Sequence, residues 1–274
     1  MPVVDIHPHV ISPDTARYPR APLGGKQSDW SRERPVSAEQ MLAAMDEAGI
    51  EKSVLVQAST CYGQDNSYVA DAVAAHPQRF AGVFSVDMLA PDAAERIRHW
   101  MGRGLSGLRV FIAGHTTAQE ARLDDPRSFP AWECAVEAGL PICVQVRAPG
   151  LGQLQTLLER FPRARVILDH MARPVVDDGP PYAAAQSLFA LARYENLYLK
   201  LTTHNLRDAP QSFLERVVKT FGAPRIAWGS NYPASEGKLA ALLADARQAL
   251  ADLSDAERDW IFSRTAKNLY AGMA

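Results

Sequence analysis

The sequence has few cysteines and no long hydrophobic run, and both absences narrow the class of protein. Its three cysteines are scattered, and no CxxC pair occurs among them. This pattern predicts neither a disulfide framework nor a zinc ribbon, and free thiols fit a reducing compartment. No apolar stretch approaches the roughly 20 residues that a transmembrane helix needs. The N-terminal residues also lack the pattern of a signal peptide. We therefore expect a cytoplasmic protein that has no membrane partner.

A surplus of charge of either sign is also missing. The 29 Lys and Arg residues nearly balance the 31 Asp and Glu residues, which gives a net charge of −2. The lack of a basic excess argues against a nucleic-acid partner. Hydrophobic residues make up 47% of the chain, which excludes a disordered protein. We expect one globular domain over residues 1–274 that acts on a small molecule, and the sequence leaves a homo-oligomer open.

Short runs rich in Val, Ile and Leu recur eight times along the chain. Most lack the alternation of apolar and polar residues seen in half-exposed strands. They are typical of parallel strands that are buried on both faces. The predicted strands are Val3–His7, Ser53–Ala58, Phe80–Asp87, Leu105–Phe111, Pro141–Val146, Val166–Met171, Leu197–Thr203 and Arg225–Ser230.

Helical stretches separate these runs. The first predicted helix starts at the capping box Ser37-Ala-Glu-Gln40 and ends at Gly49. Eight alternations of strand and helix in about 250 residues predict an α/β fold, a (β/α)8 TIM-like barrel. A doubly wound open sheet is the alternative, but no GxGxxG follows the first strand. The predicted helices are Ser37–Ala48, Asn66–Ala75, Pro91–Arg103, Phe129–Ala138, Leu151–Phe161, Tyr182–Tyr194, Pro210–Phe221, Glu236–Leu250 and Ser254–Tyr270.

One long irregular segment, Val10–Val36, lies between the first strand and the first helix. Loops of this length in compact domains are usually functional or disordered. Because the segment follows the C-terminal end of a strand, we expect it to lie over the active-site face of the barrel. There it would contribute to substrate specificity.

Two histidines end the first predicted strand, and a third lies in the sixth. His7 and His9 are two residues apart, so we expect their rings on the same face of the strand. Neighbouring strand residues point to opposite faces, so only one of Asp169 and His170 can enter the barrel. We expect His170 inside the barrel, and we expect Asp169 to anchor the nearby backbone or orient a ring. Neutral imidazoles on one face suit a divalent metal or a metal-free site for an oxyanion. The alternative is that these histidines only cap strand ends.

Polar side chains end nearly every predicted strand, and a barrel brings those ends to one place. Such a convergent ring in a concave site predicts an active site, although strand ends also turn polar simply because they reach water. Arg109, Arg147 and Arg173 would make the mouth cationic and suited to a small anionic substrate, since arginine matches carboxylates. Lys200, if it faces inward, needs an acidic partner. The polar strand ends are Gln57 and Ser59, Asp87, Arg109, Gln145 and Arg147, Lys200 and His204, and Ser230 and Asn231.

Five motifs in this order resemble the amidohydrolase-related family, and within it the 2-pyrone-4,6-dicarboxylate lactonase-like group, which includes sugar lactonases. The resemblance implies a TIM-like barrel with His7, His9 and His170 in the active site and Arg109 gripping a substrate carboxylate. Some family members bind zinc or manganese through such histidines, whereas the lactonase branch can work without metal. The motifs are Val4-Asp-Ile-His-Pro-His9, Asp65-Asn66-Ser-Tyr, Gly107-Leu-Arg109-Val-Phe, Asp169-His-Met-Ala-Arg-Pro174 and Trp228-Gly-Ser-Asn-Tyr-Pro233.

Two positions depart from the family pattern. Asn231 stands where the family often carries an Asp that acts as general base, and a carboxamide cannot accept a proton in that way. Gln145 stands where metal-dependent members often place His or Lys. We therefore expect that no cofactor is required. The alternative is a single zinc or manganese ion held by the histidines at positions 7, 9 and 170.

The residues and the resemblance together predict a hydrolase that opens the lactone of a small anionic or polyhydroxy substrate, such as a pyrone dicarboxylate or a sugar lactone. A neutral histidine with a pKa near 7 would take the proton, and Asn231 would align water. A metal-dependent decarboxylase of an aromatic or unsaturated acid is one alternative, and a non-catalytic barrel that binds a small acid is another. The expected catalytic residues are His7, His9, His170 and Asn231, and the expected substrate contacts are Arg109, Ser59, Gln57, Arg173 and Gln145.

Overall fold

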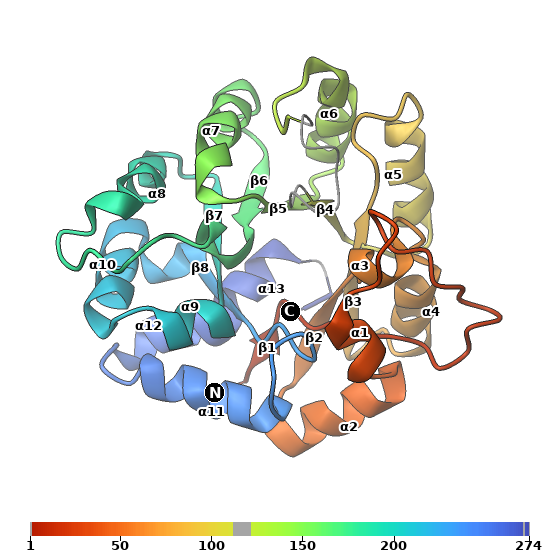
Figure 1. Cartoon of the computed structure of the whole chain (residues 1–274), viewed down its shortest axis with the longest axis horizontal. Coiled ribbons are helices and arrows are strands. Elements are labelled where there is room, and N and C mark those ends of the chain that lie inside the picture. The colour runs from red at the N-terminus through yellow and green to blue at the C-terminus, as the bar shows by residue number, and fades with distance from the viewer. Residues whose placement is uncertain (1, 112–121, 271, 274) are drawn as a thin grey trace.

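Eight parallel strands form one sheet whose order follows the sequence in the computed structural model, which describes residues 2–111, 122–270 and 272–273. The sheet curves into a nearly closed barrel, and helices surround it (Figure 1). This confirms the predicted (β/α)8 TIM-like barrel. The strands are β1 (Val4–Asp5), β2 (Lys52–Val56), β3 (Phe80–Ser85), β4 (Gly107–Phe111), β5 (Pro141–Gln145), β6 (Arg165–Leu168), β7 (Leu197–Thr202) and β8 (Ile226–Gly229).

The helices between the strands mostly start and end where local signals predict. The Ser37 hydroxyl accepts from the Gln40 backbone N–H, the Gln40 side chain accepts from the Ser37 N–H, and Gly49 ends the helix with φ of 70°. The described helices are α1 (Asp29–Glu33), α2 (Ala38–Ala48), α3 (Ser59–Tyr62), α4 (Ser67–Ala75), α5 (Ala93–Gly102), α6 (Phe129–Glu137), α7 (Leu151–Arg160), α8 (Gln186–Ala190), α9 (Thr203–Asp208), α10 (Gln211–Phe221), α11 (Leu239–Ala249), α12 (Asp255–Asp259) and α13 (Thr265–Leu269).

Several elements differ from the sequence prediction. The expected helix over 182–194 keeps only α8 as α-helix, flanked by single 3-10 turns. The last predicted helix is present, but a π-helical segment, Trp260–Arg264, joins α12 to α13. The short helices α1, α3 and α9 were not predicted. Among the described residues, no helix is long and apolar enough to cross a membrane.

Two apolar layers hold the barrel together. Inward side chains such as Val54, Val83 and Ile167 fill the interior and pack on Leu269 of α13 and on Tyr270, which follows that helix. A larger layer lies between the outer faces of the strands and the surrounding helices. The strands are therefore buried on both faces, as their unbroken apolar runs predict.

The first and last strands meet at a seam that side chains help to close. The Ile6 N–H donates to the Trp228 carbonyl over 3.2 Å. The buried Asp5 carboxylate accepts from the backbone N–H groups of His7 (3.0 Å) and Ser230 (2.8 Å). Gly229 permits this approach, because a Cβ there would lie 2.6 Å from the Cβ of His7. The seam thus positions the residues that follow β1 at the barrel mouth.

Candidate active site

A cavity of about 270 Å³ lies where the carboxyl ends of the strands converge, which is where barrel enzymes carry their active sites. Seven of the nine side chains expected at the site line it, and His7 and Gln57 lie behind this lining. The segment over 10–36 contributes two further residues. The lining consists of His9, Ser28, Trp30, Ala58, Ser59, Thr60, Arg109, Phe111, Gln145, His170, Arg173, Asn231 and Ala234.

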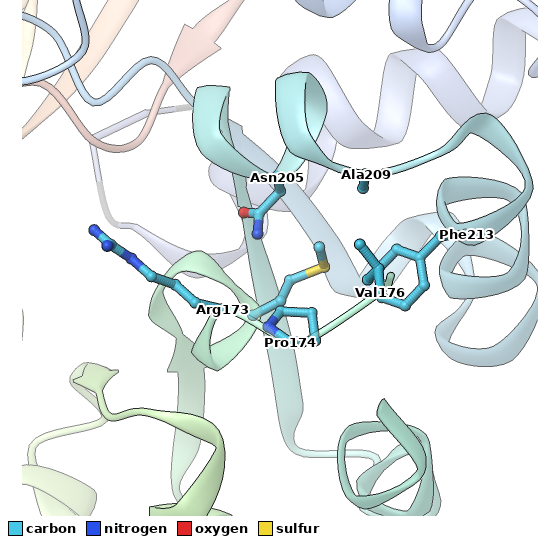
Figure 2. Close-up of a pocket in the computed structure, with 7 residues that line it drawn as sticks. Arg173, Pro174, Val176, Asn205, Ala209 and Phe213 are labelled. Atoms are coloured by element: carbon cyan, nitrogen blue, oxygen red, sulfur yellow. The ribbon is translucent and has the colours of Figure 1, made fainter. Parts of the chain in front are cut away.

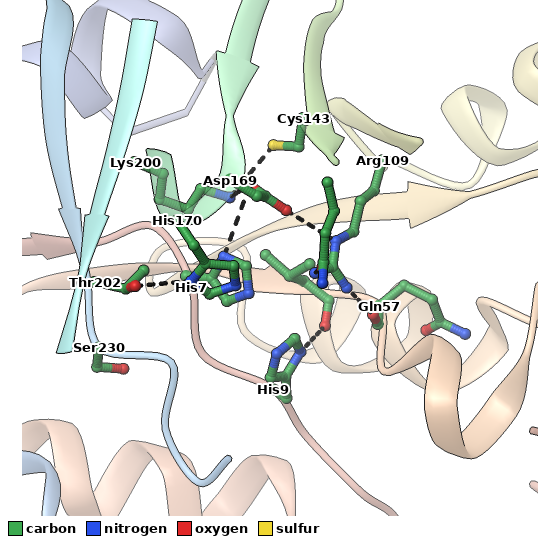
Figure 3. A network of polar contacts seen from close by, with 12 residues as sticks. His7, His9, Gln57, Arg109, Cys143, Asp169, His170, Lys200, Thr202 and Ser230 are labelled. Carbon is green, nitrogen blue, oxygen red and sulfur yellow. Dashed lines mark hydrogen bonds and ion pairs between the residues drawn. The ribbon is translucent and has the colours of Figure 1, made fainter. Parts of the chain in front are cut away.

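The three expected histidines lie together, as Figure 3 shows. The ring centroid of His7 is 5.0 Å from that of His9 and 4.9 Å from that of His170. His7 is fully buried, and among the described residues neither of its ring nitrogens has a hydrogen-bond partner. Imidazoles from two distant parts of the sequence therefore meet in one place.

Hydrogen bonding fixes which nitrogen of His9 carries its proton. His9 Nδ1 lies 2.8 Å from the carbonyl oxygen of Val56. A carbonyl oxygen can only accept, so Nδ1 carries the hydrogen and Nε2 carries the lone pair. On its other side the ring stacks on Trp30, with centroids 5.1 Å apart.

The chain enters the site through an unusual turn after β6. The strand ends at Leu168, and His170 (φ 54°), Met171 (φ 51°), Ala172 (φ 58°) and Arg173 (φ 51°) all have left-handed backbone conformations. The expected alternation therefore does not hold, and both Asp169 and His170 are buried within the site. Non-glycine residues adopt this conformation only at a cost, so surrounding contacts must hold the turn.

Asp169 is the centre of a buried ion cluster. Its Oδ1 lies 2.8 Å from Lys200 Nζ and its Oδ2 lies 3.1 Å from Arg109 Nε (Figure 3). Burial alone would raise the pKa of Asp169, but the two cations outweigh it and lower the pKa to about 2. Lys200 also donates to Cys143 Sγ over 3.4 Å, so it has the acidic partner that its inward position requires.

The histidines are neutral at pH 7. Burial, and then the charge of Arg109, lower the pKa of His9 to about 3. Burial is also the largest influence on the pKa values of His7 and His170, which lie well below the ordinary value. The expectation of a histidine with a pKa near 7 is therefore wrong for the free protein. A proton will stay on these rings only when a negative charge develops beside them.

The expected substrate contacts divide into two groups. Ser59 is buried, and within the described part of the chain its hydroxyl has no hydrogen-bond partner, so it can bind a substrate oxygen. Gln145 Oε1 accepts from Arg109 Nη2 and so orients the guanidinium. Gln57 differs from expectation, because its amide donates to the carbonyls of Gly63 (3.3 Å) and Asp65 (2.6 Å).

Asn231 lies at the cavity in a left-handed conformation with φ of 57°. Asn tolerates this conformation better than most residues do. Its Nδ2 donates to Ser235 Oγ over 3.1 Å. Arg147, expected at the mouth, is exposed and outside the lining, and the side chain of His204 lies outside the described part of the structure.

Comparison with known proteins assigns the family. The model of the family described as "Amidohydrolase" matches residues 4–272. This chain belongs to that family. The chain is 26% identical over 243 residues to an L-fucono-1,5-lactonase of Burkholderia ambifaria, covering 85% of this chain and 80% of the relative. It is also 28% identical over 305 residues to an L-fucono-1,5-lactonase of Burkholderia multivorans, covering 98% of this chain and 95% of the relative.

Solved structures share the fold of this amidohydrolase. A Pseudomonas putida protein assigned as a 2-pyrone-4,6-dicarboxylic acid hydrolase superimposes with a TM-score of 0.82 at 20% identity, covering 99% of this chain and 98% of that one. A zinc-bound amidohydrolase of Burkholderia multivorans superimposes with a TM-score of 0.77 at 20% identity, covering 99% of each chain. A manganese-bound dihydroxybenzoic acid decarboxylase of Polaromonas superimposes with a TM-score of 0.69 at 20% identity, covering 98% of this chain and 96% of that one.

Two of these solved structures hold a metal, so we ask whether the donor atoms present here suit one. A neutral imidazole offers one lone pair, so His7 can supply one ligand atom, but the one carboxylate of the ion cluster, Asp169, is already paired with two cations. Asn231 supplies no charge. Across the described residues, no three His, Cys, Asp or Glu side chains are arranged to hold a metal ion. This donor set does not fit a divalent metal as it stands.

Sequence reasoning did not assign four residues of the site. Trp30 lies in the segment over 10–36, and only its place there gave a signal. Lys200 was counted among the converging strand ends, but no role beyond an ion pair was expected for it. Thr202 and Asn205 contact His170 from β7 and α9, and the Thr-x-x-Asn spacing of a capping box is the only local sign of them.

Proposed function

We propose that this amidohydrolase opens a lactone ring by hydrolysis, and that its substrate carries a carboxylate or several hydroxyl groups. One observation carries the proposal: neutral imidazoles and arginines line a single cavity next to a buried ion cluster. The L-fucono-1,5-lactonase relatives and the pyrone dicarboxylic acid hydrolase structure support the same reaction class.

The charges at the site favour an anionic substrate or intermediate. Lys200 and Arg109 contribute two positive charges and Asp169 one negative charge, so this cluster keeps a net charge of +1. Arg173 also lines the cavity. In a buried site, fixed charges of this kind stabilise a developing oxyanion without reorganising during the reaction.

His170 is the proton acceptor in this proposal. Its ring lines the cavity, and the neighbouring carboxylate of Asp169 supports a positive charge on it. The attacking water, aligned by Asn231, bonds to the lactone carbonyl carbon and gives a proton to His170 Nε2. The tetrahedral oxyanion then collapses, the ring C–O bond breaks, and His170 returns the proton to the leaving oxygen. The product is the open-chain hydroxy acid.

The other residues bind and orient the substrate. Arg109, held by Asp169 and Gln145, faces a substrate carboxylate or hydroxyl, and the Ser59 hydroxyl donates to a substrate oxygen. Orienting the ring against the attacking water turns binding energy into rate. An anion beside His170 also raises the pKa of that imidazole, so the bound substrate makes it a better proton acceptor than it is in the free protein.

No metal is required in this proposal, because the carboxylate at the site is already neutralised by Lys200 and Arg109. The first part of the test is a set of sugar lactones and dicarboxylate lactones, assayed by acid release with a pH indicator. The enzyme is expected to hydrolyse at least one of them. His170→Ala is expected to lose ~10²–10⁴-fold in kcat.

His99→Ala is the matched control, because His99 is an exposed helix histidine far from the cavity lining. Wild-type rates in His170→Ala would refute the assigned role. Release of carbon dioxide from a dihydroxybenzoate only after manganese is added would favour the decarboxylase instead. If only Asn231→Asp shows activity, the natural protein is an acid-binding barrel.

A further inference from the structure

The orientation of the Asn205 side chain is fixed by two backbone groups with opposite hydrogen-bonding roles. Asn205 Nδ2 lies 3.0 Å from the carbonyl oxygen of His170, which can only accept. Asn205 Oδ1 lies 3.1 Å from the backbone N–H of Thr202, which can only donate. A flipped amide would place like groups against each other at both contacts. Oδ1 therefore faces β7, and Nδ2 faces the turn.

This orientation determines the direction of the next hydrogen bond. Asn205 Oδ1 also lies 3.2 Å from the Thr202 hydroxyl oxygen. Since a carboxamide oxygen can only accept, the single hydroxyl proton of Thr202 points to Asn205. The Thr202 oxygen lies 2.7 Å from His170 Nδ1, and the two atoms must share a hydrogen. Because the hydroxyl proton is already used, His170 Nδ1 is the donor.

We propose that Asn205, acting through the Thr202 hydroxyl, holds His170 in the tautomer that leaves the lone pair on Nε2. Both are positioning residues, since they reach the reaction only through the imidazole. The catalytic consequence rests on the proposed function, because His170 is the proton acceptor there. The tautomer itself follows from the contacts alone. All three side chains are buried, so water does not compete strongly for these bonds.

Asn205 also supports the left-handed turn. Its Nδ2 donates to the carbonyl of His170, the first of four consecutive residues with positive φ. Figure 2 shows the outer side of this turn, where Asn205 reaches from α9 toward the chain near Arg173 and Pro174. A pocket lies on that side, and Val176 and Phe213 contribute apolar surface to it beside Arg173. One carboxamide thus fixes both the backbone and the tautomer of His170.

The test reads the tautomer directly by nitrogen NMR of the intact protein labelled with ¹⁵N-histidine at pH 7.5. The signals of His170 are assigned by their loss in His170→Gln. In the wild type, Nε2 is expected to show the shift of an unprotonated ring nitrogen and Nδ1 that of a protonated one. The opposite pattern in the wild type would overturn the proposal, and this measurement needs no substrate.

The series of hydrogen bonds from Asn205 through the Thr202 hydroxyl to His170 is called the relay here. Two variants break it at different points. Asn205→Leu frees the Thr202 hydroxyl to donate to His170, so a substantial fraction of the protein is expected to move its proton from Nδ1 to Nε2. Thr202→Val removes the acceptor, and we expect mixed tautomers with a 10–100-fold loss in kcat and little change in KM, as for other residues that orient a catalytic group. Thr202→Ser keeps the hydroxyl and is expected to restore the wild-type pattern.

Thr265→Val is the matched control, because Thr265 is equally buried and, among the described residues, its hydroxyl bonds to the carbonyls of Ala223 and Pro224 alone. It should leave the His170 signals unchanged. If Asn205→Leu and Thr202→Val both keep the lone pair on Nε2, the relay does not set the tautomer. If the tautomer is as inferred but no lactone is hydrolysed, the proposed function fails and this inference stands.

Discussion

Replacing Asp169 by asparagine tests the ion cluster at the centre of the barrel. The substitution keeps the shape of the side chain but removes the charge that faces Lys200 Nζ at 2.8 Å and Arg109 Nε at 3.1 Å. Two cations would then remain buried without a counter-charge. Because desolvated like charges repel strongly, we expect a large loss of stability.

Two independent estimates give the size of this loss. The pKa of Asp169 lies at about 2, against 3.8 for a free aspartate, so the ionised form is stabilised by about 2 kcal/mol. Breaking a buried ion pair by removing one partner typically costs about 3–5 kcal/mol. We therefore expect the free energy of unfolding at pH 7 to fall by about 2–5 kcal/mol in Asp169→Asn.

Asp71 provides a matched control on the protein surface. It also lies between two arginines, 2.7 Å from Arg17 and 2.8 Å from Arg103, but those arginine side chains are 65% and 43% exposed. Asp71→Asn is expected to cost at most about 1 kcal/mol, because water screens such pairs. Urea unfolding of both variants gives the comparison. Equal losses in the two variants would refute the view that burial makes the central cluster important.

A double variant separates charge from packing. Lys200→Met removes one of the two cations that Asp169→Asn leaves unpaired. In the double variant the unfolding free energy is therefore expected to recover part of the loss seen in Asp169→Asn. A loss equal to the sum of the two single variants would show that the two residues do not interact, contrary to their 2.8 Å contact.

Three further predictions concern packing, pH and metal. Gly229→Ala is expected to cost about 1–3 kcal/mol, because its Cβ would meet His7 at 2.6 Å, whereas Gly102→Ala, which meets nothing within 4 Å, is expected to be neutral or slightly stabilising. Lowering the pH from 7.5 to 5.5 is expected to reduce the free energy of unfolding by about 1.4 kcal/mol through His9 alone. The pKa of His9 is about 3 in the folded chain and 6.5 in the unfolded one, so the unfolded chain binds more protons as the pH falls, and His9→Gln should flatten this slope. Lactone hydrolysis is expected to survive prolonged treatment with a chelator, and elemental analysis is expected to find much less than one metal ion per chain. Loss of activity that zinc or manganese restores would contradict the metal-free proposal.

The fold could be predicted from the sequence because its signals are local and repeated. Eight apolar runs with intervening helices indicated the barrel, and the capping box at Ser37 and Gly49 marked the first long helix correctly. The prediction of helices failed where tertiary contacts override the local preference of the sequence for helix. The expected helix over 182–194 contains no glycine or internal proline, yet only Gln186–Ala190 is α-helical.

The site was only partly predictable for the same reason. The grouping of His7, His9 and His170 followed from strand ends, but the direction of Asp169 did not. The turn residues 169–173 include no Gly or Asn, the residues that usually mark a left-handed turn. That turn is instead held by Asn205, which lies on a helix 35 residues further along the chain. The residues close to position 170 in the sequence therefore do not reveal the left-handed turn.

The side-chain closure between β1 and β8 also bears on how the protein is made. β1 is synthesised before the other seven strands, yet the Trp228 carbonyl and the Ser230 N–H that secure it emerge only when nearly the whole barrel has left the ribosome. Contacts between such distant segments form slowly, because a long loop must close first. His7 and His9 should thus be among the last groups to reach their native positions during biosynthesis, and a nascent chain truncated before β8 should hold them unassembled.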